Sequence, residues 1–139
     1  MALQTILVGY DDSETAGRAL ERAATLAQAL GAALIVTSVA PVTETAVGRS
    51  LGADPVEPAS DHLRELACAR NQLEQLGVAA SYIEAVGHKG EGLLAAAADR
   101  GADLIVVGAA HASLIGRLFG SSVPDTVAHR ATCDVLIVR

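Results

Sequence analysis

Short, wholly apolar runs alternate along the chain with longer segments of helical periodicity. Ile6-Leu7-Val8, Leu34-Ile35-Val36 and Leu104-Ile105-Val106 are typical of strands that are covered on both faces. Between the first two runs, residues 16–30 place apolar side chains three and four positions apart, as an amphipathic helix does. Because each connection between parallel strands must cross over the sheet, this alternation predicts an α/β fold with helices on both faces.

Turn formers and caps divide the chain into five predicted strands and four predicted helices. The strands are Gln4–Tyr10, Ala33–Val39, about Ala79–Val86, Asp103–Gly108 and Asp134–Val138. The helices run from the turn Asp11-Asp12-Ser13 to about Leu30, from a cap at Ser60 or Asp61 to Leu76, from Gly90 to about Arg100, and from a capping box at Ser122 with Asp125. Pro41–Ala59 is left as a long loop. We expect residues 1–139 to form a single domain.

Composition excludes several classes of partner. The chain has 10 basic and 16 acidic residues, and this balance disfavours a nucleic-acid partner, which is bound mainly through clustered Lys and Arg. Cys68 and Cys133 show no CxxC spacing, so we predict no metal site and expect two buried or half-buried thiols in a reducing compartment. No apolar run approaches the roughly 18 residues of a membrane span, and we expect a cytoplasmic protein with no membrane association.

Ligands of such sheets bind beyond the carboxyl ends of the strands, so the loops there are the candidate sites. They contain no GxxxxGK[ST], GxGxxG or GxSxG motif. Asp11-Asp12 suggests a Mg²⁺ site like that of phosphorylated receiver domains. That chemistry also needs an Asp after the third strand and a Lys after the fifth, where this chain has Val86-Gly87 and Val138-Arg139. We therefore favour the alternative, in which Asp11-Asp12-Ser13 caps a helix.

The remaining polar residues give weaker signals. The loop after Gly108 ends at Ser121-Ser122, where helix N–H groups and hydroxyls could hold phosphate. His62, His88 and His129 have no carboxylate or Cys at a ligand spacing, and we interpret each as a surface or hydrogen-bonded residue. No Ser/His/Asp set is visible in the sequence, although a triad assembled in space stays open.

Three stretches carry a resemblance to a known family. They are Ile6-Leu7-Val8-Gly9-Tyr10-Asp11-Asp12-Ser13, Ala102-Asp103-Leu104-Ile105-Val106-Val107-Gly108, and the ending from Ser122-Val123-Pro124-Asp125 through Cys133 to Val138. Together they resemble the universal stress protein family from one end of the chain to the other. The resemblance implies a three-layer α/β/α domain with an open parallel five-stranded sheet of order 3-2-1-4-5. This is the adenine nucleotide alpha hydrolase-like (HUP-type) architecture.

The resemblance also implies a binding site for ATP, associated with Mg²⁺, or for another adenine nucleotide. Asp11 would meet the ribose or the adenine edge, and Val39 would lie beside the adenine. Ser121, Ser122 and Val123 would meet the phosphates. The predicted site is completed by Tyr10, Asp12, Gly108, His111 and Gly120.

The glycine motif of the ATP-binding members, G-x₂-G-x₉-G-[ST], is incomplete here. Without a gap, Gly108 matches the first glycine, His111 replaces the second, and Ser121-Ser122 occupies the last two positions. A one-residue deletion would align Gly120-Ser121 with the Gly-Ser pair. Glycine allows close approach of backbone to phosphate, so His111 could narrow the pocket or serve as a substitute donor.

By the same resemblance, the chain is a non-catalytic regulatory module that forms a homodimer through its last strand, Asp134–Arg139. Two alternatives stay open: a slow ATP-hydrolysing enzyme on the same fold, and a protein-binding dimer that has lost the nucleotide.

Overall fold

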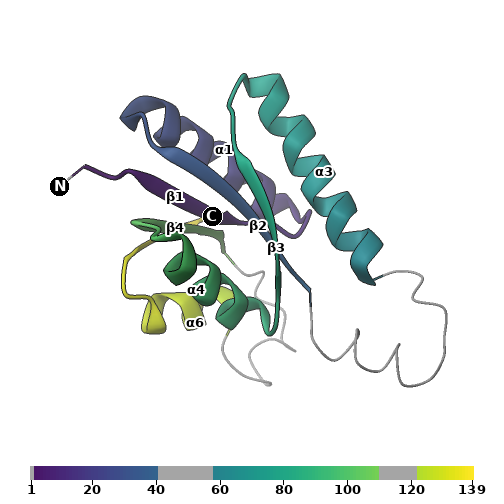
Figure 1. Ribbon diagram of the computed structural model, residues 1–139, viewed down its shortest axis with the longest axis vertical. Coiled ribbons are helices and arrows are strands. Elements are labelled where there is room, and N and C mark those ends of the chain that lie inside the picture. The colour runs from purple at the N-terminus through teal and green to yellow at the C-terminus, as the bar shows by residue number, and fades with distance from the viewer. Residues whose placement is uncertain (1, 41–57, 110–121) are drawn as a thin grey trace.

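In the computed structural model, which describes residues 2–40, 58–109 and 122–139, five parallel strands form one sheet with helices on both faces (Figure 1). The sheet order is β3-β2-β1-β4-β5, which confirms the predicted topology. The strands are β1 (Thr5–Gly9), β2 (Ala33–Ala40), β3 (Ser81–Val86), β4 (Leu104–Gly108) and β5 (Asp134–Val138). The helices are α1 (Glu14–Leu30), α3 (Pro58–Leu76), α4 (Lys89–Arg100) and α6 (Val123–Arg130).

The central strand β1 shows why its sequence must be wholly apolar. Leu7 pairs with Ile35 of β2 on one side and with Ile105 of β4 on the other. Side chains of a strand alternate between the two faces of the sheet. Ile6 and Val8 therefore enter the core under α1 and α3, whereas Leu7 enters the core under α4 and α6. Both faces are covered, so a polar residue at any of these positions would be buried.

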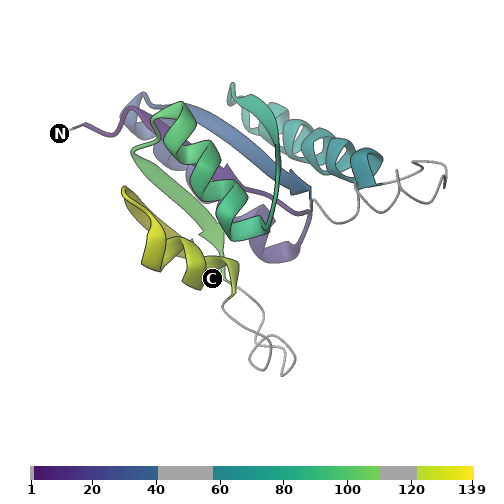
Figure 2. The same ribbon diagram turned by 60° about the horizontal axis from the view of Figure 1, so that its bottom comes forward.

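Helices cover the sheet from both sides (Figure 2), and alanine lines much of the inner faces of α1 and α4. The α1 face is formed by Ala16, Ala19, Leu20, Ala23, Ala24 and Ala27. Ser13 caps the start of this helix by accepting from the Ala16 N–H at 3.2 Å. Gly31 ends it in the left-handed conformation, with φ of 65°.

The start of α3 corrects one prediction. The helix begins at Pro58, so the predicted caps Ser60 and Asp61 lie inside it. Proline fits the first turn of a helix because the N–H that it lacks would have no partner there. Five of the ten strand ends, including both ends of β5, coincide with the predicted ones, and the others differ by one or two residues. Within the described ranges, no helix is both long and apolar enough to cross a bilayer.

Candidate functional site

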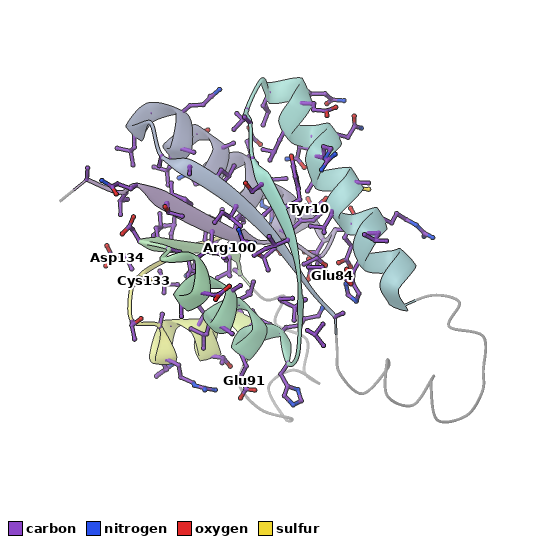
Figure 3. The ribbon with its side chains drawn as sticks, viewed as in Figure 1. Tyr10, Glu84, Glu91, Arg100, Cys133 and Asp134 are labelled. Atoms are coloured by element: carbon purple, nitrogen blue, oxygen red, sulfur yellow. The ribbon has the colours of Figure 1, made fainter. Side chains whose placement is uncertain are left out.

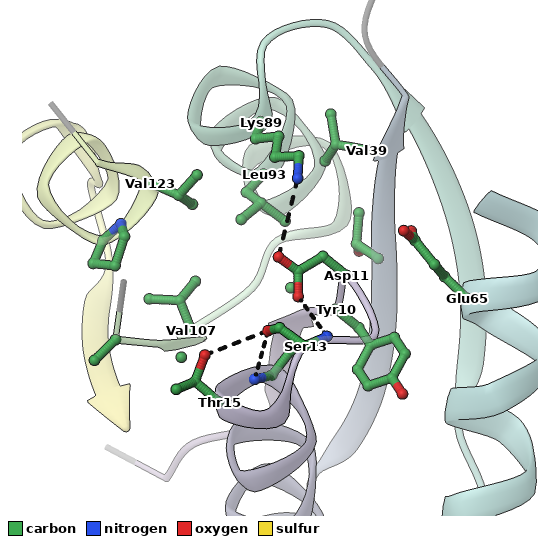
Figure 4. Close-up of a pocket in the computed structure, with 16 residues that line it drawn as sticks. Tyr10, Asp11, Ser13, Thr15, Val39, Glu65, Lys89, Leu93, Val107 and Val123 are labelled. Atoms are coloured by element: carbon green, nitrogen blue, oxygen red, sulfur yellow. Dashed lines mark hydrogen bonds and ion pairs between the residues drawn. The ribbon is translucent and has the colours of Figure 1, made fainter. Parts of the chain in front are cut away.

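The turn after β1 places a carboxylate at the carboxyl edge of the sheet. Asp12 adopts a positive φ of 61°, which Asp tolerates better than most residues. Oδ1 of Asp11 accepts from the Ser13 N–H at 3.1 Å, immediately before α1 begins. The interpretation of this turn as a helix cap is thus confirmed at Ser13. The second carboxylate oxygen of Asp11 stays free of the turn and faces α4 (Figure 4).

A cavity of about 210 Å³ lies at the carboxyl ends of β1, β2 and β4 (Figure 4). This is where the strand order reverses, the usual ligand position in open α/β sheets. Five predicted site residues line it together: Tyr10, Asp11, Val39, Gly108 and Val123. Its other walls are apolar at Leu93, Val107 and Pro124, and polar at Ser13, Thr15, Glu65 and Lys89.

The other predicted site residues lie elsewhere. Asp12 is not among the residues that line the cavity, and its carboxylate accepts from the Tyr10 hydroxyl at 3.1 Å. Ser122 caps α6, where its hydroxyl accepts from the Asp125 N–H at 3.3 Å, as the capping box predicted. His111, Gly120 and Ser121 lie outside the described residues, as do Arg117 of the same loop and most of the long interval Pro41–Ala59.

Tyr10 is held in its neutral form. Burial raises the pKa of its phenol well above the ordinary value, and the hydrogen bond to Asp12 and the negative charge of that residue raise it further. The side chain is only 7% exposed. Tyr10 therefore acts at neutral pH as a hydrogen-bond donor that fixes the turn of Asp12.

Gly108, the first glycine of the incomplete motif, has a packing role. A Cβ on this residue would come within 2.7 Å of the carbonyl carbon and oxygen of Thr15, which belong to the backbone of α1. The first turn of α1 therefore approaches the end of β4 as closely as glycine allows. The need for glycine here follows from the fold itself, whatever the cavity binds.

Ser38, His62 and the half-buried Glu65 form a polar cluster beside the cavity. Ser38 Oγ donates to Glu65 Oε2 at 2.5 Å, and His62 Nδ1 lies 3.0 Å from the serine oxygen and 3.1 Å from the carboxylate. Ser38 has a single hydroxyl proton, which it donates in the hydrogen bond to Glu65. His62 Nδ1 must then carry the proton that it shares with the two oxygens. This differs from a catalytic triad, in which the serine and the acid contact opposite ring nitrogens.

The cluster connects the second strand to α3 and orients Glu65. Ser38 is fully buried on β2 and His62 is 8% exposed on α3. With Oε2 engaged by both partners, the Glu65 side chain is held where it lines the cavity (Figure 4). His62 is thus a hydrogen-bonded residue, one of the two interpretations that we gave it. The statement that no carboxylate stands at a ligand spacing from His62 was wrong, because Glu65 lies one helical turn further along α3.

Two further observations describe the polar chemistry of the region. Thr37 Oγ1 is the one buried side-chain N or O atom without a hydrogen-bond partner in the part of the chain that the structure describes, and Thr37 borders the cavity. No group of three or more His, Cys, Asp and Glu side chains among the described residues is placed to hold a metal ion. Cys133 is half-buried as expected, whereas Cys68 is exposed on α3, so the expected burial of this thiol was wrong.

Comparison with known proteins identifies the family. The model of the Universal stress protein family matches residues 2–139. The chain belongs to the universal stress protein family. Universal stress protein Rv1636 of Mycobacterium tuberculosis is 35% identical over 145 residues, which cover 99% of this chain and 97% of that protein. A universal stress protein of Thermus aquaticus is 32% identical, with 98% of each chain covered.

Solved structures agree with this assignment. A universal stress protein in complex with cAMP superposes with a TM-score of 0.77 at 31% identity, covering 100% of this chain and 99% of that one. The protein MJ0577 superposes with a TM-score of 0.80 at 23% identity over 99% of this chain and 96% of its own, which shows the common fold.

Two polar features of this universal stress protein were missed by sequence reasoning. Glu65 follows His62 by three residues, one helical turn, and that spacing is the signal that could have paired them. Lys89 Nζ lies 4.0 Å from Asp11 Oδ2 across the cavity. As the chain's one lysine, placed three residues after the end of β3, it stands at the sheet edge where ligands bind.

Proposed function

We propose that this universal stress protein binds an adenine nucleotide in the cavity at the carboxyl edge of β1, β2 and β4, and acts as a non-catalytic regulatory module. The observation that carries the proposal is the meeting of Asp11, Val39, Gly108 and Val123 around one cavity. The resemblance assigns these residues to both the adenosine side and the phosphate side of the ligand. The relative that was solved with cAMP supports the same class of ligand.

The chemistry of the walls suits this ligand. Val39, Leu93 and Val107 offer an apolar slot in which a flat base loses water-exposed surface. Asp11, 46% exposed at the mouth, offers a carboxylate that accepts hydrogen bonds from ribose hydroxyls. Ser122 and the start of α6 supply N–H and hydroxyl groups near Val123, on the side where phosphate would lie.

The assembly that we propose is a homodimer of single domains, residues 1–139, in the cytoplasm. Among the described strands, β5 pairs with β4 alone and forms one edge of the sheet. Ile137 on this strand is 41% exposed. An open edge strand is covered when a second subunit pairs with it, and Asp134–Arg139 is the segment that would do so.

The proposal is tested by thermal unfolding and calorimetric titration with AMP, ATP and cAMP, with GMP as the control ligand. A ligand at 100 times its dissociation constant stabilises the fold by about 2.7 kcal/mol, so the midpoint should rise by several degrees. ATP is measured with and without Mg²⁺, and release of phosphate is followed over hours.

We expect the midpoint of unfolding to rise with the adenine ligands and not with GMP, and we expect no release of phosphate from ATP. Steady phosphate release would replace the regulatory module by the ATP-hydrolysing enzyme. No rise with any adenine ligand at millimolar concentration would contradict nucleotide binding and favour the protein-binding dimer.

A further inference from the structure

Two carboxylates line the candidate cavity, which poses a problem for an anionic ligand. Asp11 and Glu65 both border it, and the chain as a whole carries a net charge of −6. A phosphate that enters beside uncompensated carboxylates is repelled by them, and the repulsion is strongest where protein excludes water. A cation close to the phosphate position would offset this repulsion. Among the described residues that line the cavity, the one cation is Lys89.

Lys89 is placed to serve this purpose. Its side chain extends from the first residue of α4 toward Asp11, and its Nζ stops 4.0 Å from the carboxylate (Figure 4). The two side chains are 52% and 46% exposed. An ion pair that is this long and this open to water is weak, so a better partner can displace it. Lys89 is thus held near the mouth of the cavity without being tied to Asp11.

The backbone beneath Lys89 is fixed by two glycines in the first turn of α4. A Cβ on Gly92 would come within 2.6 Å of Val39 Cγ1, and a Cβ on Gly90 within 2.7 Å of Thr126 Cγ2. The first turn of α4 is therefore set closely between the end of β2 and α6. Val39 belongs to the base side of the proposed ligand, and α6 to its phosphate side. The backbone of Lys89 therefore lies between the base side and the phosphate side of the proposed ligand (Figure 4).

We propose that Lys89 binds the phosphate of the nucleotide. In the empty cavity Asp11 holds the ammonium loosely. When the ligand binds, the ribose hydroxyls donate hydrogen bonds to the Asp11 carboxylate. The Lys89 ammonium then turns to the phosphate and forms a charge-assisted hydrogen bond with it. Lys89 therefore selects phosphorylated adenosine over adenosine. This inference rests on the proposed function, because it assumes that the cavity accepts adenosine.

The test is calorimetric titration of the full chain with adenosine and with AMP, in the wild type and in Lys89→Met. Methionine keeps an unbranched side chain of similar length and removes the charge. We expect the affinity for AMP to fall by about tenfold or more and the affinity for adenosine to change by less than about twofold. Lys89→Arg, which keeps the cation, should restore most of the preference for AMP. Raising the salt concentration should weaken AMP binding more in the wild type than in Lys89→Met.

Arg100→Met is the matched control. Arg100 lies at the other end of α4 from Glu91 and Lys89, is exposed, and its replacement makes the same change in net charge (Figure 3). It should leave both affinities unchanged.

Three results would overturn the inference. Equal losses for adenosine and AMP in Lys89→Met would show a structural effect. An AMP affinity in Lys89→Met equal to that of the wild type would remove Lys89 from phosphate binding and leave the proposed function standing. Absence of binding of either ligand to the wild type would overturn the proposed function, and this inference with it.

Discussion

At the scale of the residue, Tyr10 couples the fold to pH. Its pKa is raised by burial and by Asp12, above the value near 10 that a tyrosine has in an unfolded chain. Below pH 10 the phenol is neutral in both states, and its contribution to stability is fully present. Above pH 10 the unfolded chain loses the proton first, so the free energy of unfolding falls as the pH rises.

We predict that Tyr10→Phe reduces this alkaline loss. In the wild type, Tyr10 should contribute a fall of about 1.4 kcal/mol per pH unit between pH 10 and its folded pKa, because the folded state alone keeps the proton. Phenylalanine has no proton to lose, so the slope should be shallower. Urea unfolding at several pH values from 8 to 11 measures it. Tyr82→Phe is the comparison. Burial also raises the pKa of Tyr82, but Arg70 opposes the shift, so this variant should change the slope less than Tyr10→Phe does. Equal slopes in Tyr10→Phe and in the wild type would contradict the prediction.

Single residues also show where sequence reasoning about the site reaches its end. The positions of Asp11 and Val39 at the cavity could be predicted from the sequence, because each residue stands at the end of a strand and the family resemblance assigns it to the site. Glu65 does not follow in this way. Its contact with Ser38 joins residues 27 positions apart and depends on how α3 packs across β2. Packing of that kind comes from many apolar contacts together, which local spacing does not reveal.

At the scale of the element, two glycines should respond in opposite directions to the same change. Gly108→Ala would place a methyl group 2.7 Å from the α1 backbone at Thr15, and we expect it to destabilise the fold by about 1–3 kcal/mol. Gly17→Ala lies within α1, where the nearest atom outside the helix to a new Cβ is Gln72 Oε1 at 3.9 Å. It should stabilise the fold by about 0.5–1 kcal/mol, because alanine favours the helix.

Denaturant unfolding of the two variants without ligand measures both effects. A Gly108→Ala protein as stable as the wild type would show that α1 can move away from β4 at no cost. The result also bears on ligand studies, since a loss of nucleotide binding in Gly108→Ala could come from displaced packing. Ligand titrations of this variant need the stability measurement beside them.

Elements themselves were mostly readable from the sequence. Wholly apolar runs mark the strands because the sheet is covered on both faces, and the left-handed glycine Gly31 marks the end of α1. The start of α3 was misplaced because Ser60 and Asp61 are good caps in isolation. Pro58 is an equally good first-turn residue, and local preference cannot rank the two.

At the scale of the whole molecule, the open β5 edge makes the assembly testable. We predict that Ile137→Lys converts the proposed homodimer to a monomer, because an inserted charge at a paired edge would be buried without a partner. Light scattering coupled to size-exclusion chromatography gives the mass directly. Leu63→Lys is the control and should leave the dimer intact. Leu63 is 59% exposed on α3, which packs against β2 and β3, at the end of the sheet far from β5. A dimer that survives Ile137→Lys would place the interface elsewhere.

The cluster of Ser38, His62 and Glu65 has a consequence for how chains of this kind can change length. Ser38 on β2 and His62 on α3 lie 24 positions apart in the sequence, so their contact forms against the conformational entropy of the intervening chain. The entropy cost of bringing two such points together grows only with the logarithm of the chain length between them, and each doubling costs about 0.6 kcal/mol. Insertions and deletions between β2 and α3 should therefore cost little stability as long as the contacts of Ser38 with His62 and Glu65 are kept.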